Sequence, residues 1–112
     1  MQLIRGTTPT ITCRIKQEID LHNIVQVWIY IAQQNKVKVD KTISDVMFDY
    51  ENRTVAVTLL QEDTLALKEG EAKIQIRGLM QDGTALGMIA KTIDIKQIYK
   101  QGIITTEETD NG

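Results

Sequence analysis

The stretch Ile24-Val-Gln-Val-Trp-Ile-Tyr-Ile-Ala32 decides the fold class of this chain. Its residues are mainly β-branched or aromatic, which favours an extended strand, and it is too short to span a membrane. Because side chains of a strand point alternately to its two faces, every second residue should enter a core. The sequence therefore predicts a long central strand. The residues expected on its core face are Val25, Val27, Ile29 and Ile31.

The regions on both sides of this strand also alternate with a period of two. Residues 10–16 carry apolar side chains at every second position, which predicts a half-buried strand. After the central strand, Asn35-Lys36 has the composition of a turn and precedes a lysine-rich stretch that is typical of an edge strand. Another strand is expected from Ile43 to Tyr50. It should form a hairpin, through Glu51-Asn52-Arg53, with a strand over residues 54–59.

The pattern changes in the stretch from Gln61 to Gly70, where helix-forming residues follow acidic ones. This composition predicts one short helical turn, closed by Gly70 in the left-handed conformation. A strand with alternating apolar residues follows, and Asp82-Gly83 is a strong hairpin signal. A last pair of strands is expected near residues 84–95 and 97–104.

Together these elements predict an all-β fold, an antiparallel sandwich with one short helical turn. A small Greek-key barrel is the alternative that the pattern leaves open. The length of 112 residues, with 42% hydrophobic and 25% charged residues, fits a single domain over residues 1–104. Residues 105–112 lack apolar side chains, and we expect a disordered acidic tail there. The predicted core contains Ile11, Val27, Ile29, Phe48, Val57, Leu59, Leu67, Ile74 and Ile76.

The charge pattern and the start of the chain weaken several classes of partner. The 13 Lys and Arg residues are balanced by 15 Asp and Glu, and the basic residues are scattered rather than grouped to follow a row of phosphates. We therefore expect no nucleic-acid ligand. No apolar run has the length of a signal-peptide core or of a membrane span, so we expect neither export nor membrane insertion.

Candidate catalytic groups are few. His22 is the single histidine and Cys13 the single cysteine, which excludes a histidine metal triad and an intramolecular disulfide. Cys13 is expected in the core and His22 in a hydrogen-bonded loop. The acidic pairs Asp45 with Asp49 and Glu62 with Asp63 read as solvated charges. Asp49, Glu51 and Asn52 lack the glycine and spacing of a calcium loop. We expect no enzyme activity, no cofactor and no metal.

The aromatic residues of the central strand are the more informative feature. If Val27 and Ile29 face the core, alternation places Gln26, Trp28 and Tyr30 on the opposite face. Exposed Trp and Tyr often anchor protein interfaces, which makes these three residues a candidate contact surface. Two alternatives remain open: another segment covers the two rings, or the register is inverted and Trp28 is a core residue.

Two stretches resemble small proteins encoded in the tail-module regions of tailed phages and prophages. One is Leu3-Ile-Arg-Gly-Thr-Thr-Pro-Thr10, and the other runs from Val57 to Gly70 and continues from Ala72 to Thr84. The second is also similar to the N-terminal immunoglobulin-like domain of phage upper baseplate proteins. The resemblance covers most of residues 3–104, and from this sequence we expect no receptor-binding or fibre segment.

The resemblance implies an immunoglobulin-like sandwich and a structural or assembly role in a phage tail or baseplate. It implies no catalytic residues. The partners would be other phage structural proteins or further copies of the chain, in the virion or the host cytoplasm, with contacts through edge strands and the aromatic face. An alternative reading is a ligand- or carbohydrate-binding sandwich of a bacterial surface, in which Trp28 and Tyr30 stack on a sugar.

Overall fold

The computed structural model of the protein describes residues 1–99 and 102–106, and the expected tail beyond Thr106 lies outside them. The strands of this part are β1 (Gln2–Ile4), β2 (Thr10–Arg14), β3 (Ile24–Gln33), β4 (Lys36–Thr42), β5 (Val46–Asp49), β6 (Thr54–Thr58), β7 (Gly70–Met80) and β8 (Ala85–Lys96). The helices are α1 (Gln61–Leu65) and two short 3₁₀ helices, η1 (Leu21–Asn23) and η2 (Ile43–Asp45).

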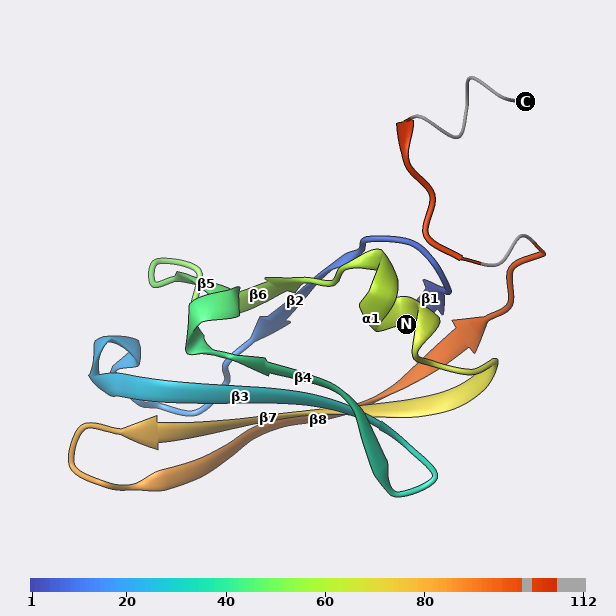
Figure 1. The fold of residues 1–112 in the computed structure, drawn as a ribbon. Coiled ribbons are helices and arrows are strands. Elements are labelled where there is room, and N and C mark those ends of the chain that lie inside the picture. Colours follow the sequence, from blue (N-terminus) through green and yellow to red (C-terminus); the bar gives the residue numbers. More distant parts are fainter. Residues whose placement is uncertain (100–101, 107–112) are drawn as a thin grey trace.

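The strands form two sheets that lie face to face (Figure 1). The larger sheet has the order β1-β8-β7-β3-β4, and the smaller has the order β2-β6-β5. The predicted all-β sandwich is therefore confirmed. Contrary to the expected antiparallel arrangement, the larger sheet contains one parallel pair. Its edge strand β1, which was not predicted, runs parallel to the end of β8. Its Leu3 is 2% exposed and fills the core at that edge.

The core lies between the two sheets, as the alternation predicts. Eight of the nine residues expected there are buried, but Phe48 is only half-buried at the border of the cluster. Val25 was also expected in the core and is 44% exposed. The pairing of β3 with β7 shifts between Ile24 and Gln26, so Ile24 takes the buried position that strict alternation assigned to Val25.

Turn chemistry explains the hairpins. Gln34 and Asn35 join β3 to β4 with φ angles of 53° and 64°, the left-handed values that a tight type I′ hairpin requires. The turn thus lies one residue earlier than expected. Asp82-Gly83 lies between β7 and β8 as predicted, and Gly83 has a φ of 91°. β5 and β6 form the expected hairpin, in which Asp49 accepts hydrogen bonds from the backbone and side chain of Asn52.

Three expected elements differ in the structure. The strand from Ile43 to Tyr50 is shorter, because Asp45 accepts a hydrogen bond from the Thr42 amide and holds η2 before β5 begins. The helical turn ends at Leu65, and Gly70 begins β7 with a φ of 123° instead of closing the helix. Residues 97–99 and 102–104 form no strand: β8 ends at Lys96, and the edge position beside it is taken by β1.

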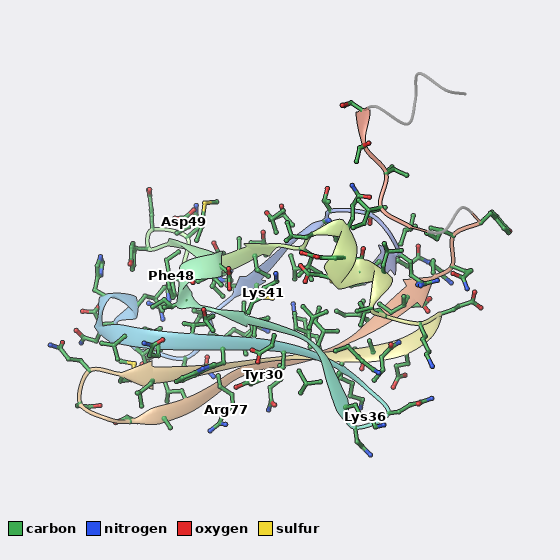
Figure 2. The ribbon with its side chains drawn as sticks, viewed as in Figure 1. Tyr30, Lys36, Lys41, Phe48, Asp49 and Arg77 are labelled. Atoms are coloured by element: carbon green, nitrogen blue, oxygen red, sulfur yellow. The ribbon has the colours of Figure 1, made fainter. Side chains whose placement is uncertain are left out.

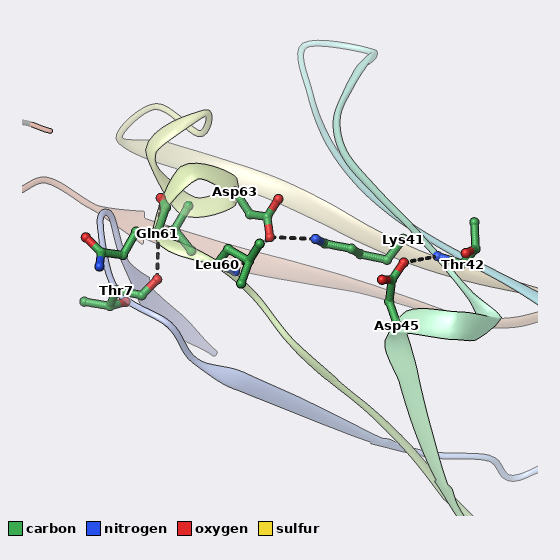
Figure 3. A network of polar contacts seen from close by, with 8 residues as sticks. Thr7, Lys41, Thr42, Asp45, Leu60, Gln61 and Asp63 are labelled. Atoms are coloured by element: carbon green, nitrogen blue, oxygen red, sulfur yellow. Dashed lines mark hydrogen bonds and ion pairs between the residues drawn. The ribbon is translucent and has the colours of Figure 1, made fainter. Parts of the chain in front are cut away.

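Polar contacts hold α1 between the layers (Figure 3). Lys41 of β4 lies 2.8 Å from the Asp63 carboxylate, and the Thr64 hydroxyl donates to the Thr7 carbonyl at 2.9 Å. Asp63 also accepts a hydrogen bond from the Leu60 amide, which satisfies a free donor at the start of the helix. None of the helices in the described residues is long and apolar enough to cross a membrane.

Candidate interaction surface

The outward face of the larger sheet carries the aromatic residues of β3. Val27, Ile29 and Ile31 are at most 1% exposed and point toward the smaller sheet. Alternation then places Trp28 and Tyr30, both half-buried, on the side away from that sheet, together with the exposed Gln26. We call this side of β3, β4, β7 and β8 the outer face. Trp28 is therefore not part of the buried core between the sheets.

Strand register defines the neighbours of the two rings. Trp28 lies opposite Arg77 of β7 on one side and Thr42 of β4 on the other. Tyr30 lies opposite Gln75 of β7 and Asp40 of β4. In Figure 2, Tyr30 and Arg77 lie on the side of the sheet away from β5 and β6. Directly opposite residues on one face are close enough to interact, so each aromatic ring lies among polar and charged groups.

A depression of about 380 Å³ lies beside Tyr30 on the outer face. Its lining combines apolar and polar residues: Tyr30, Ala32, Val37, Lys73, Ile74, Gln75, Lys91 and Thr92. The pairing of β3 with β4 shifts between Ile31 and Ala32, and such an irregularity bends a strand. The hairpin tip accordingly curves toward the outer face (Figure 1), which makes that face concave.

The charges near the depression are mainly positive. Lys73 borders it, and Arg77 lies further along the same face of β7. Both side chains are exposed, and within the described part of the chain neither pairs with a carboxylate. Asp40, opposite Tyr30, is the acidic neighbour on β4. The surface thus offers apolar contact area together with cations that pair with no carboxylate of the described residues, a combination suited to an apolar ligand that also carries carboxylates.

The two expected structural residues, His22 and Cys13, lie in different environments. His22 is exposed on η1, where Nδ1 is 3.1 Å from Oδ1 of Asp20 and the imidazole stacks on Tyr50 at a centroid distance of 3.9 Å. Hydrogen bonds from the backbone and side chain of His22 lower the pKa of Asp20. Cys13 is 2% exposed in the core, and burial raises the pKa of its thiol. A buried neutral thiol is a poor nucleophile.

The acidic residues singled out from the sequence have local structural contacts. The side chain and then the backbone amide of Asn52 lower the pKa of Asp49 by donating hydrogen bonds to it. Asp45 accepts from Thr42, and Asp63 pairs with Lys41, while Glu62 is exposed. Among the residues that the structure describes, no group of three His, Cys, Asp or Glu side chains is arranged to hold a metal ion.

Comparison with known proteins adds information about the fold alone. No protein-family model and no curated protein matches the chain. CopC from Methylosinus trichosporium OB3b is similar in structure, with a TM-score of 0.53 and 12% identity over 90% of this chain and 87% of that one. A Bacteroides vulgatus protein described as a glycoside hydrolase gives a TM-score of 0.51 and 11% identity. The match covers 88% of this chain but 17% of the hydrolase chain.

Sequence reasoning found the rings of the outer face but missed the depression beside them. The alternation of Lys73, Gln75 and Arg77 with buried isoleucines already placed these three residues on one face of a strand. The sequence did not predict the pairing that brings β7 next to β3, nor the irregularity at Ala32 that bends the hairpin. Both depend on long-range contacts.

Proposed function

We propose that the protein is a non-enzymatic interaction module of a phage tail or baseplate, which binds a neighbouring protein through the outer face. The observation that carries this proposal is the depression beside Tyr30, where exposed Val37 lies on the same face as Lys73, which forms no ion pair with the carboxylates that the structure describes. Interface centres are enriched in Tyr, Trp and Arg. The outer face carries one of each, Tyr30, Trp28 and Arg77. The module would act in the virion or in the host cytoplasm.

The sheet supports such a role physically. A surface built on paired strands changes little in shape, so less conformational entropy is lost when a partner binds than with a mobile loop. The phage assignment itself comes from the resemblance of the stretches that begin at Leu3 and Val57. In the structure, Gly6 of the first stretch serves the fold, because its φ is 75° and an added Cβ would lie 3.1 Å from Ile98.

The test is capture of the structural proteins encoded beside this chain in its genome. Each would be co-expressed with the tagged protein, and binding of those captured would be measured by calorimetry. Val37→Asp places a carboxylate in the depression and should weaken binding at least tenfold, which corresponds to about 1.4 kcal/mol. Met47→Asp is the matched control, because Met47 is 73% exposed on β5, outside the outer face. Capture of none of these proteins, or equal loss with both variants, would refute the proposal.

A carbohydrate ligand is the second candidate, favoured by one observation. The depression combines the Tyr30 ring with the amide of Gln75 and the hydroxyl of Thr92 in its lining, which are groups that hydrogen-bond sugars. Calorimetry with bacterial surface polysaccharides tests it. Saturable binding that Tyr30→Phe preserves and Tyr30→Ala removes would favour a stacked sugar, and absence of heat across the set would reject this candidate.

A further inference from the structure

The outer face defines the chemistry of its ligand. Val37 is 56% exposed at the depression, while Lys73 and Arg77 have no carboxylate partner in the described residues. A segment that satisfies both features must present aliphatic side chains followed or preceded by acidic ones. Polar contacts with exposed cations would also orient it, because carboxylates pair with Lys and Arg at short distance.

The chain itself contains such a segment near its C-terminal end. Ile103 and Ile104 are 51% and 53% exposed. They precede Thr-Thr-Glu-Glu-Thr-Asp, so residues 105–110 add three carboxylates and no cation. Two adjacent exposed isoleucines followed by acidic residues have the two properties expected of the ligand: aliphatic side chains that can contact Val37, and carboxylates that can pair with Lys73 and Arg77. We name residues 103–110 the acidic arm.

The start of this arm is held on the other side of the molecule. The Gln61 side chain accepts from the Ile104 amide at 2.7 Å and donates to the Ile104 carbonyl at 2.8 Å. These two bonds tie the arm to α1, on the side of the larger sheet that faces β2, β5 and β6 (Figure 1). The outer face is the opposite side of that sheet. The described start of the arm, residues 103–106, therefore lies on the opposite side of the sheet from the depression of the same molecule.

We propose that the acidic arm of one molecule docks on the outer face of a second copy. The isoleucines would contact Val37 and the Tyr30 ring, and Glu107 and Glu108 would pair with Lys73 and Arg77. The contact joins two different surfaces, so it either closes as a reciprocal exchange of arms between two molecules or continues from molecule to molecule into a ring or filament. It rests on the proposed function only in using the same face for protein contact.

The test is a charge swap in the whole chain, with association measured by sedimentation equilibrium at low and high salt. Lys73→Glu with Arg77→Glu, and separately Glu107→Lys with Glu108→Lys, should each weaken association about tenfold or more, because each places like charges together. Combining all four changes should restore it. Arg14→Glu with Lys16→Glu is the matched control, since Arg14 ends β2, Lys16 follows it closely, and both are exposed outside the outer face. The control should associate as the wild type does.

The outcomes separate this inference from the proposed function. A wild-type protein that stays monomeric at high concentration, or a combined variant that fails to recover association, overturns the arm contact. Circular dichroism of every variant checks that the fold is intact. If copies do not associate but tail proteins still bind the outer face, the inference fails and the proposed function stands. If the charge swap controls association but no tail protein binds, the arm contact stands without that function.

Discussion

Lys41 and Asp63 form an ion pair that joins the edge strand β4 to helix α1, with 2.8 Å between Nζ and Oδ2. Their side chains are 14% and 16% exposed, so water screens the pair less than it would at an open surface. The same carboxylate oxygen accepts from the Leu60 amide. The Asp63 side chain thus caps the start of the helix and also fixes the helix against the larger sheet.

Removing one partner of this pair should cost more than an exposed salt bridge. Lys41→Met keeps most of the aliphatic stem but leaves Asp63 without its cation. We expect a loss of about 1.5 to 3 kcal/mol in the free energy of unfolding, the range for hydrogen bonds to charged groups. Denaturant unfolding of Lys41→Met, Asp63→Asn and the double variant measures the coupling. Strictly additive losses would show that the two side chains do not interact.

Cys13 should make stability depend on pH in the alkaline range. Burial raises the pKa of its thiol, with a smaller opposite effect from Lys91. A pKa raised in the folded state gives stability that is complete below the unfolded value, about 8.5, and is lost as the pH rises through the folded value. The wild type should therefore lose its advantage over Cys13→Ala above about pH 8.5. A difference in the free energy of unfolding between the two proteins that stays constant up to about pH 10 would contradict this. The comparison ends there because tyrosine side chains ionise at about that pH.

The two faces of β3 should respond differently to truncation. Ile29 is 1% exposed, and Ile29→Ala should cost about 2 to 5 kcal/mol because it leaves a cavity. Val25 is 44% exposed beside the irregular pairing, and Val25→Ala should change stability by less than about 0.5 kcal/mol. Urea unfolding measures both. Similar costs for the two variants would mean that the register of β3 is wrong.

The sequence was most informative where local chemistry determines structure. Alternation identified the buried faces of β2, β3, β6 and β7, and Asp82-Gly83 identified the hairpin between β7 and β8. The errors arose where distant contacts decide. Leu3 is buried only because β1 pairs with a strand some ninety positions later, and Ile104 is held by the Gln61 side chain instead of by a strand. No local pattern specifies either contact.

For the candidate surface too, local patterns were predictable from the sequence and distant contacts were not. Period two placed Trp28 and Tyr30 on one face and Lys73 and Arg77 on one face. Only the pairing of Trp28 with Arg77 and of Tyr30 with Gln75 brings these two faces together. The bend that forms the depression depends on the shift in strand pairing at Ala32. The residues there are ordinary strand residues, so the sequence does not predict this shift. A surface assembled from several strands is therefore recognised only in part from sequence.

The outer face can be tested directly through its aromatic rings. Trp28 and Tyr30 are half-buried, so Trp28→Ala with Tyr30→Ala should leave the domain folded. Each change should cost less than the roughly 3 to 5 kcal/mol of a core aromatic truncation. If the rings anchor a partner, the double variant should lose at least about 2 kcal/mol of binding free energy, a weakening of about thirtyfold.

The matched control for this experiment is Tyr50→Ala, because Tyr50 is 46% exposed and stacks on His22 and Phe48 outside the outer face. It removes a tyrosine that is more exposed than Tyr30, without altering the depression. Thermal unfolding and binding of a captured partner are measured for both proteins. Unfolding of the double variant would show that Trp28 supports the core after all. A folded double variant that binds as tightly as Tyr50→Ala would exclude the aromatic face and shift the contact to the edge strands, because these carry the remaining unpaired backbone groups of the sheets.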